Sequence, residues 1–355
     1  MDRNSRIFIA GHTGLVGSAI LRKMIDAGFD NLLLKPHPEL DLRNQAQVES
    51  FFADYRPEYV ILAAAKVGGI YANSTQKADF IYDNIMIAIN MIHASWKNGV
   101  KKLINLGSSC IYPKEAPQPL KEEYLLSGYL EPTNDAYAIA KIAAIKMCNA
   151  YNEQKHTNYF SAMPTNLYGP GDNFNLETSH VLPAIIRKMH LGKCLEKEDW
   201  PAIFNDFTRR PVDGFTGKIS VDSMIYLLKR YGISADGQKV IITLWGDGSP
   251  YREFLYTDDL AEAIVFLVEN INADDLKEGF LNVGSGYDLT IKSLSEIIKE
   301  IVGFNGEIRW DGSKPNGTFR KLLDASIIES FGWKHKTSLK TGIEKEYNWY
   351  LNNLL

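Results

Sequence analysis

Residues 11–20 read GHTGLVGSAI and directly follow the short apolar run RIFIA. That run is typical of a buried strand, whereas Leu15 to Ala27 carries apolar side chains at helical spacing. Gly11, Gly14 and Gly17 therefore fall at a strand-to-helix turn. Glycine tolerates a positive φ and lets a ligand approach the backbone, so the stretch predicts a turn that holds the pyrophosphate of a dinucleotide. The alternative is a turn whose glycines only let the helix pack closely on the strand.

Strands and helices alternate along the first half of the chain. The strand-like runs are RIFIA, NLLLK, YVILAAA, KLINLGS and FSAMPTN, and the helical stretches lie near Val16, near Gln45, at 79–96 and at 136–152. This alternation is typical of a parallel sheet covered by helices on both faces. We therefore expect an α/β fold in which residues 1–170 form a Rossmann-type doubly wound sheet that later segments complete.

The second half predicts a smaller C-terminal α/β domain over residues 171–355. Its strand-like and helical stretches are VIITLWG, 258–268, GFLNVGSG, a helix near Leu294, EIRW and a helix from Leu339. Residues 192–237 are rich in charge and interrupted by prolines and glycines. We interpret this block as an insertion with at least one helix, because Val221 to Tyr231 has helical periodicity.

Composition limits the class of protein. The net charge is −4, and charged residues of both signs are interspersed along the chain. This distribution favours neither a nucleic acid nor a membrane surface as partner. The three cysteines lack C-x-x-C spacing, so we expect neither a disulfide framework nor a bound metal. The apolar runs are too short for a signal peptide or a membrane span. A cytoplasmic protein is expected.

A second group of residues indicates carbonyl chemistry. Tyr137 and Lys141 are four residues apart, so on a helix they lie on one face about one turn apart. A nearby ammonium, together with an oxidised nicotinamide, is expected to lower the phenol pKa towards a value useful for proton exchange. Ser108 ends the KLINLGS strand and can donate a second hydrogen bond to a carbonyl oxygen. A solvated helix face offers such Tyr–Lys pairs by chance, but the combination with the glycine turn favours a reductase centre.

These motifs resemble the extended short-chain dehydrogenase/reductases. Within that family, AAAKVGGIYAN, LGSSCIYP, LEPTNDAYAIAKIA, MPTNLYGPGDNF, SHVLPA, REFLYTDDLA and KPNGTFRKLLD resemble the GDP-L-fucose synthase branch. The resemblance spans nearly the whole chain apart from 192–237. It implies an NADPH-dependent epimerase/reductase of a GDP-4-keto-6-deoxy sugar, most simply the mannose-derived one, that works as a homodimer joined through the helices at 79–96 and 136–152.

The resemblance also implies roles for single residues. Ser108, Tyr137 and Lys141 would form the reductase centre, whereas Cys110 and His180 would exchange protons at C3 and C5 of the sugar. Both of the latter have alternatives, as a buried apolar thiol and a helix-terminal histidine. The implied NADP(H) contacts are Gly11, Thr13, Gly14, Leu15, Val16, Gly17, Lys35, His37, Asp41, Leu42, Ala63, Ala64, Ala65, Leu106, Lys141, Pro164, Asn166, Leu167 and His180. The implied substrate contacts are Ser109, Asn166, Val181, Lys188, Trp245, Arg252, Asn316 and Lys321.

Departures from the family pattern keep other functions open. Lys188 and Asn316 stand where the family commonly has arginine and aspartate, and Thr13 and His37 stand where it has arginines. Lys35 and His37 still provide cations after the second strand, and no acid stands where it would bind a ribose 2′-hydroxyl, which favours NADPH over NADH. The alternatives are a C4-reductase of a GDP-4-keto-6-deoxy-heptose for capsule or lipopolysaccharide, an NAD-dependent nucleotide-sugar 4-epimerase, and a non-catalytic dinucleotide sensor.

Overall fold

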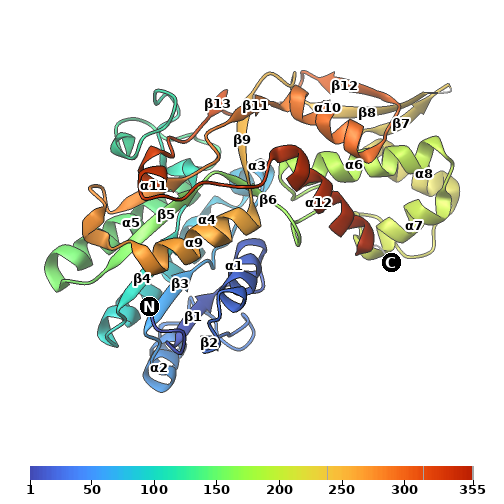
Figure 1. The fold of residues 1–355 in the computed structure, drawn as a ribbon. Coiled ribbons are helices and arrows are strands. Elements are labelled where there is room, and N and C mark those ends of the chain that lie inside the picture. Colours follow the sequence, from blue (N-terminus) through green and yellow to red (C-terminus); the bar gives the residue numbers. More distant parts are fainter. Residues whose placement is uncertain (238, 315, 354–355) are drawn as a thin grey trace. The chain divides into compact units, whose positions relative to one another are not determined.

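The computed structural model describes residues 1–237, 239–314 and 316–353, and the chain divides into two compact units (Figure 1). Unit 1 comprises residues 1–167, 253–287 and 321–337. Unit 2 comprises residues 168–252, 288–320 and 338–355. Two segments from the second half of the sequence thus belong to the unit that contains the glycine turn.

Unit 1 is built on a six-stranded parallel sheet, which confirms the predicted Rossmann-type fold. The strand order is β10-β5-β4-β3-β1-β2. The strands are β1 (Ile7–Ala10), β2 (Leu32–Leu33), β3 (Tyr59–Leu62), β4 (Lys102–Leu106), β5 (Tyr159–Pro164) and β10 (Phe280–Val283). The order reverses between β1 and β3, which are direct neighbours, and a ligand of such a sheet binds outside the carboxyl ends of the strands at that reversal.

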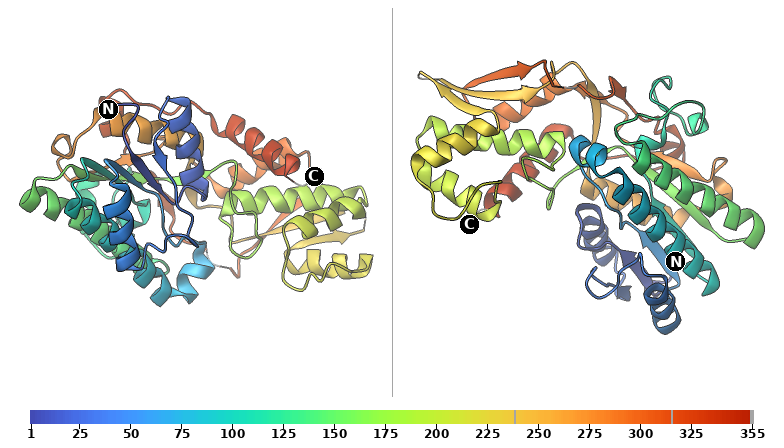
Figure 2. Two further views of the ribbon diagram at one scale, coloured as in Figure 1. Left: turned by 90° about the horizontal axis from the view of Figure 1, so that it is seen from below. Right: turned by 180° about the vertical axis from the view of Figure 1, so that it is seen from behind.

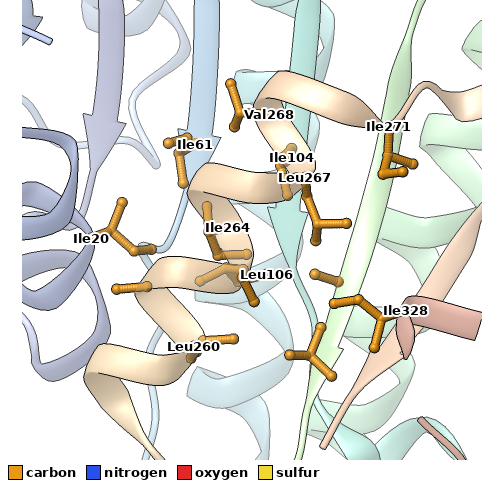
Figure 3. Packing of buried hydrophobic residues seen from close by; sticks show 14 of the residues in the cluster. Ile20, Ile61, Ile104, Leu106, Leu260, Ile264, Leu267, Val268, Ile271 and Ile328 are labelled. Carbon is orange, nitrogen blue, oxygen red and sulfur yellow. The ribbon is translucent and has the colours of Figure 1, made fainter. Parts of the chain in front are cut away.

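Side chains of alternating strand residues point to opposite faces of this sheet, and helices bury both faces. Ile7 and Ile9 of β1 belong to a buried cluster with residues of α1 (Leu15–Asp26) and α9 (Thr257–Asn270). Figure 3 shows Ile264 and Leu267 of α9 in this cluster, close to Ile104 of β4. Phe8 and Ala10 pack on the other face with α2 (Gln45–Tyr55), α4 (Lys77–Lys97) and α5 (Asp135–Lys155). The two long helices α4 and α5 lie side by side (Figure 2). The sequence placed both correctly to within three residues at each end.

Unit 2 contains a three-stranded sheet of order β12-β8-β7 with helices beside it. Its strands and helices are β7 (Ile233–Asp236), β8 (Lys239–Trp245), β12 (Glu307–Asp311), α6 (Val181–Glu196), α7 (Trp200–Arg209), α8 (Val221–Arg230), α10 (Ile291–Val302) and α12 (Leu339–Asn352). Helix α6 packs on β8, and Gly192 permits this, because a Cβ there would lie 2.9 Å from Ile242 Cδ1.

The block at 192–237 contains more regular structure than the sequence indicated. It begins inside α6 and contains α7, α8 and β7. Helix α8 agrees with the predicted helical stretch, whereas α7 was missed because proline and charged residues surround its short apolar pattern.

The remaining elements are short. They are α3 (Ile70–Thr75), α11 (Ser326–Ser330), η1 (Ser109–Ile111), η2 (Glu122–Tyr124), η3 (Ala273–Asp275), β6 (Asn166–Tyr168), β9 (Tyr251–Tyr256), β11 (Asp288–Thr290) and β13 (Arg320–Lys321). Among the described residues, no helix combines the length and the apolar character that a bilayer crossing requires.

Candidate functional site

The glycine turn between β1 and α1 has the geometry of a phosphate cradle. Gly11 has a φ of +85°, and a Cβ there would lie 2.7 Å from the Ala64 nitrogen. Gly17 has no room for a side chain because its Cβ would overlap the Gly11 carbonyl. Gly14 is different: only ordinary contact at 3.5 Å surrounds its missing Cβ, so packing alone does not require glycine there. This open position is where a ligand would approach.

The start of α1 offers hydrogen-bond donors to an anion. Gly14 is the N-cap residue, has no side chain to cap the helix, and no acidic residue occupies the first turn. Beside it, the buried Nδ1 of His12 has no hydrogen-bond partner among the described residues. Exposed backbone N–H groups at a helix N-terminus attract phosphate groups. The turn therefore fits the pyrophosphate of NADP(H).

The other predicted cofactor residues follow the carboxyl ends of neighbouring strands. Ala63 follows β3, and its N–H donates to the Ala10 carbonyl at 3.0 Å, which sets the two loops next to each other. Leu106 ends β4 and Pro164 ends β5. Asn166 follows β5 and donates to the Glu253 carbonyl at 2.7 Å. Because all strands are parallel, these residues gather along one edge of the sheet.

The loop after β2 carries the predicted adenosine-side residues. Lys35 pairs with Glu39 at 2.9 Å, and His37 is 68% exposed with its Nδ1 3.9 Å from Asp41. Arg43, which the sequence analysis did not single out, donates to both carboxylate oxygens of Asp41. This bidentate contact lowers the pKa of Asp41 to about 2. Asp41 is thus a fixed carboxylate at neutral pH.

The three residues of the predicted reductase centre lie together in unit 1. Ser108 follows β4, and its hydroxyl is close enough to the Tyr137 phenol to lower the phenol pKa. Lys141 lies one turn after Tyr137 on α5, with its Nζ 5.7 Å from the ring centre. The Leu106 carbonyl accepts from Lys141 Nζ at 2.7 Å and holds the ammonium there. The Phe80 ring of α4 packs edge-on against the Tyr137 ring, with the two ring centres 6.2 Å apart.

Burial dominates the titration of this centre. It raises the pKa of Tyr137, an effect that Cys110 increases and the Ser108 hydrogen bond opposes. Burial also lowers the pKa of Lys141 to about 8. We expected Lys141 and an oxidised nicotinamide together to lower the phenol pKa, whereas burial, the largest influence in the protein alone, raises it. The phenol is therefore protonated at neutral pH and suited to donate a proton.

Cys110 lies in the η1 turn, two residues after Ser108. Its side chain is 6% exposed, and its N–H lies 3.4 Å from the Ser108 hydroxyl oxygen. Burial raises the pKa of the thiol, whereas Lys321, Ser108 and Lys141 lower it. Ser109 is buried in the same turn. The thiol is thus a protonated group next to the reductase centre, and the ammonium groups of Lys321 and Lys141 are close enough to lower its pKa.

Other predicted substrate residues belong to unit 2. Lys188 of α6 donates to the Thr243 carbonyl at 3.3 Å, two residues before Trp245 at the end of β8. Asn316 accepts from the Asp247 N–H at 3.0 Å, just past the same strand end. The Trp245 side chain is 60% exposed. Unit 2 thus brings an ammonium, an exposed indole and an amide to one end of β8.

Three further residues assigned to substrate or cofactor also lie in unit 2. His180 is the exposed N-cap residue of α6 and Val181 is the first residue of that helix. Arg252 donates to the Tyr251 carbonyl at 2.7 Å, and burial lowers the pKa of its guanidinium to about 10.

Sequence reasoning missed Arg43 and Glu253. Glu253 is fully buried, and its Oε1 accepts from the N–H groups of Ser285 and Gly286. It fixes the chain after β10 in unit 1. Glu253 directly follows Arg252, and Arg43 stands two residues after Asp41, but Ser285, a partner of Glu253, and Asp83, the second partner of Arg43, lie far away in the sequence.

Comparison with known proteins gives this geometry a family. Residues 7–208 and 223–284 match the model of the NAD dependent epimerase/dehydratase family, with a gap inside the block at 192–237. The chain is 50% identical to putative GDP-L-fucose synthase 2 of Arabidopsis thaliana, over 100% of this chain and 94% of that protein. The chain belongs to the GDP-L-fucose synthase branch of that family. It is an NADP(H)-dependent epimerase/reductase.

Two solved structures are similar over almost their full length. A GDP-6-OMe-4-keto-L-xylo-heptose reductase from Campylobacter jejuni shares 42% identity with a TM-score of 0.92, covering 99% of both chains. A GDP-mannoheptose C4 reductase from the same organism, solved with NADP bound, shares 42% identity with a TM-score of 0.87 and covers 99% of both chains. The nucleotide-sugar branch and the cofactor predicted from the sequence are therefore confirmed.

Proposed function

We propose that this enzyme converts GDP-4-keto-6-deoxy-mannose to GDP-L-fucose, by epimerisation at C3 and C5 and then reduction at C4. The observation that carries this proposal is the position of Cys110, a protonated thiol in the turn that also carries Ser108. A reductase needs Ser108, Tyr137 and Lys141 but has no use for a thiol there. The 50% identity to a putative GDP-L-fucose synthase supports the same substrate.

In the reduction, Tyr137 is the proton donor. NADPH, when bound, supplies a hydride to C4 of the sugar. The protonated phenol gives its proton to the developing oxyanion, and the Ser108 hydroxyl donates a second hydrogen bond to the same oxygen. Lys141, fixed by the Leu106 carbonyl, provides positive charge beside the phenolate that results. The arrangement stabilises negative charge first on the sugar and then on the tyrosine.

In the epimerisation, Cys110 and His180 exchange protons at C3 and C5. The 4-keto group acidifies both neighbouring C–H bonds, so a group that removes a proton from one face and a group that returns one to the other invert the centre. The keto group exists only before reduction. Epimerisation therefore precedes hydride transfer.

A second candidate is a reductase of a GDP-4-keto-6-deoxy-heptose. The two heptose reductases similar in structure favour it. In that case Cys110 would be a small buried apolar residue. The NAD-dependent 4-epimerase and the non-catalytic sensor have less support, since a sensor needs no proton donor and a 4-epimerase needs no Cys110.

We also propose a homodimer in which α4 and α5 pack against their copies. Tyr82 is 61% and Ile89 43% exposed on α4, and Ile139 is 47% exposed on α5. Exposed apolar side chains on two adjacent helices are typical of a two-fold interface. The three free cysteines fit a reducing cytoplasm, where we place the enzyme.

The substrate proposal is tested with a panel of GDP-4-keto-6-deoxy sugars, with six and with seven carbons. Nicotinamide absorbance measures NADPH consumption, and NMR of the product gives the configuration at C3 and C5. We expect the six-carbon sugar to give the highest kcat/KM and an inverted product. A higher kcat/KM with the heptose, or a product without inversion, would support the second candidate instead.

A further inference from the structure

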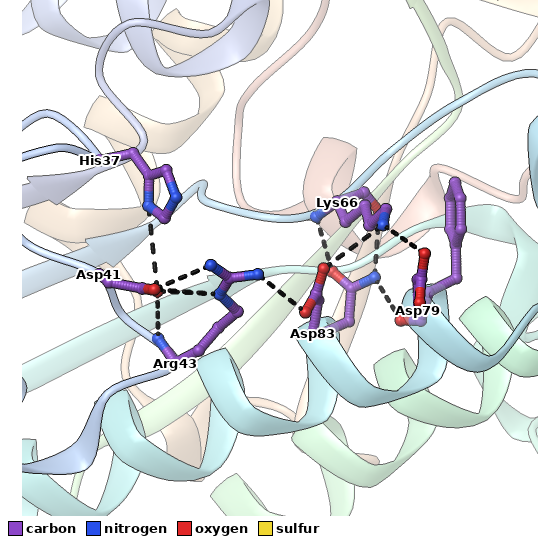
Figure 4. Close-up of polar contacts among 8 residues, drawn as sticks. His37, Asp41, Arg43, Lys66, Asp79 and Asp83 are labelled. Carbon is purple, nitrogen blue, oxygen red and sulfur yellow. Dashed lines mark hydrogen bonds and ion pairs between the residues drawn. The ribbon is translucent and has the colours of Figure 1, made fainter. Parts of the chain in front are cut away.

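Arg43 links the adenosine-side loop to helix α4. Its Nε and Nη2 bind the Asp41 carboxylate, and its Nη1 donates to Asp83 of α4 at 3.2 Å (Figure 4). The Asp83 side chain is only 15% exposed. Charged hydrogen bonds in a partly buried place are stronger and more directional than surface ion pairs. The guanidinium is therefore fixed from both sides.

The same carboxylate reaches the loop after β3. Asp83 Oδ2 lies 3.5 Å from Nζ of Lys66, the residue directly after Ala63 to Ala65. The neighbouring Asn84 accepts from the Lys66 N–H at 3.0 Å and donates to the Lys66 carbonyl at 3.0 Å. Backbone and side chain of Lys66 are thus both held by one turn of α4.

Helix α4 makes a third contact with these loops. Asn90 is 5% exposed and donates to the Leu42 carbonyl at 2.9 Å. The loops that contain Asp41, Leu42 and Ala65 are therefore all anchored on one helix, α4. A helix of 21 residues, packed on the sheet and on α5, is a rigid reference for them.

We propose that Asp83 is a positioning residue for NADP(H): through Arg43 it orients the Asp41 carboxylate, and through Lys66 it fixes the loop after β3. This rests on the proposed placement of the adenosine beside Asp41. The group bound is the adenosine half of the cofactor, which NADPH and NADH share. Asp83 therefore acts on dinucleotide affinity and not on the choice between the two cofactors.

The test uses the purified full-length protein with Asp83→Asn, which keeps the shape of the side chain and removes its charge. Asp79→Asn is the matched control, because Asp79 also pairs with Lys66 at 3.3 Å but is 63% exposed and lies on the far side of Lys66 from Arg43 (Figure 4). Arg43→Gln breaks the same link from the other side. NADP⁺ and NAD⁺ binding is measured by calorimetry without sugar, and KM, kcat and Tm are measured for each variant.

We expect Asp83→Asn to raise the Kd for NADP⁺ and the KM for NADPH about five- to tenfold, as loss of a charge-assisted hydrogen bond would. The Kd for NAD⁺ should rise by the same factor, with kcat and the sugar KM unchanged. Asp79→Asn should match the parent. In the double variant with Arg43→Gln, the Kd for NADP⁺ should rise by less than the product of the two single-variant factors, because both substitutions break the Arg43–Asp83 contact, whereas the Lys66 contact is lost only with Asp83.

Several results would overturn the inference. One is parental affinity in Asp83→Asn, and another is an effect on NADP⁺ but not NAD⁺, which would place the role at the 2′-phosphate. A fall in kcat with unchanged KM would also contradict it. If Asp83→Asn does not fold, parental affinity in Arg43→Gln would overturn it. Absence of NADP⁺ binding by the parent protein would instead refute the proposed function.

Discussion

The ammonium of Lys141 lies 5.7 Å from the ring centre of Tyr137, where the Leu106 carbonyl holds it at 2.7 Å. The lysine is therefore anchored to the end of β4 and not to the phenol. Burial keeps the phenol protonated and lowers the pKa of the lysine to about 8. Tyr137 and Lys141 thus approach the reaction as a neutral acid and an ammonium that is lost in mildly alkaline solution.

Tyr137→Phe should abolish reduction and preserve the ring that packs against Phe80. A general acid contributes about 10²–10⁴ in rate, so kcat for NADPH oxidation should fall by that factor. The Kd for NADP⁺, measured by calorimetry, should stay within about twofold of the parental value, because the Tyr137 hydroxyl contributes only a small part of the contact between protein and cofactor. A variant that turns over at the parental rate would remove Tyr137 from the chemistry.

Lys141 should produce an alkaline limb in the pH profile. Its pKa of about 8 means that the ammonium is present below that pH and lost above it, so kcat/KM should decline as the pH rises through 8. Lys141→Arg retains a positive charge throughout this range. Its profile should be flat there, although its activity is lower. A limb that persists unchanged in Lys141→Arg would assign the titration to another group.

Cys110→Ser should uncouple inversion from reduction. A hydroxyl is a far weaker acid and base than a thiol, whose ordinary pKa is about 8.5. In deuterated water without cofactor, the variant should lose label uptake at C3 or C5, as measured by NMR. With NADPH, it should reduce C4 without full inversion. Uptake at both carbons at the parental rate would make Cys110 a core residue only.

Asp172 and Glu346 should make unit 2 less stable as the pH rises. Burial raises the pKa of Asp172 to about 7, and burial together with repulsion from Asp172 raises the pKa of Glu346 well above its ordinary value. The folded state thus binds more protons than the unfolded state from about pH 4 upward, so the free energy of unfolding falls as the pH rises through 7. Glu346→Gln should recover on the order of 2 kcal/mol at pH 8 and little at pH 4, measured by urea unfolding. The exposed Glu344→Gln serves as control, and equal gains at both pH values would contradict this assignment.

Ile139→Asp should convert the proposed dimer to a monomer. The side chain is 47% exposed on α5, and a charge placed in an apolar interface stays unpaired. Ile225→Asp on α8 is the matched control, with 44% exposure in unit 2. Sedimentation velocity at micromolar concentration should show a dimer for the parent and control and a monomer for Ile139→Asp. A monomeric parent would refute the dimer.

Much of the fold follows from local pattern in the sequence. The run RIFIA, the glycines at 11, 14 and 17 and the helical spacing after them determine a strand, a turn and a helix, because each depends on residues within one or two turns. Tyr137 and Lys141 lie on one helix face through their spacing alone. The same reasoning gave the parallel sheet, since strands joined by helices leave few other arrangements.

What the tertiary structure decided concerns residues far apart in the chain. Strand β10 joins β5 across more than a hundred residues, and no local signal assigns residues 280–283 to the first sheet. Arg43 contacts Asp83, 40 positions further along the chain, and Asp172 repels Glu346, which lies far from it in the sequence. The direction of the Tyr137 pKa also depended on burial, which sequence spacing does not contain. Local hydrogen bonds and periodicity determine elements, whereas burial and charge pairing depend on which elements pack together.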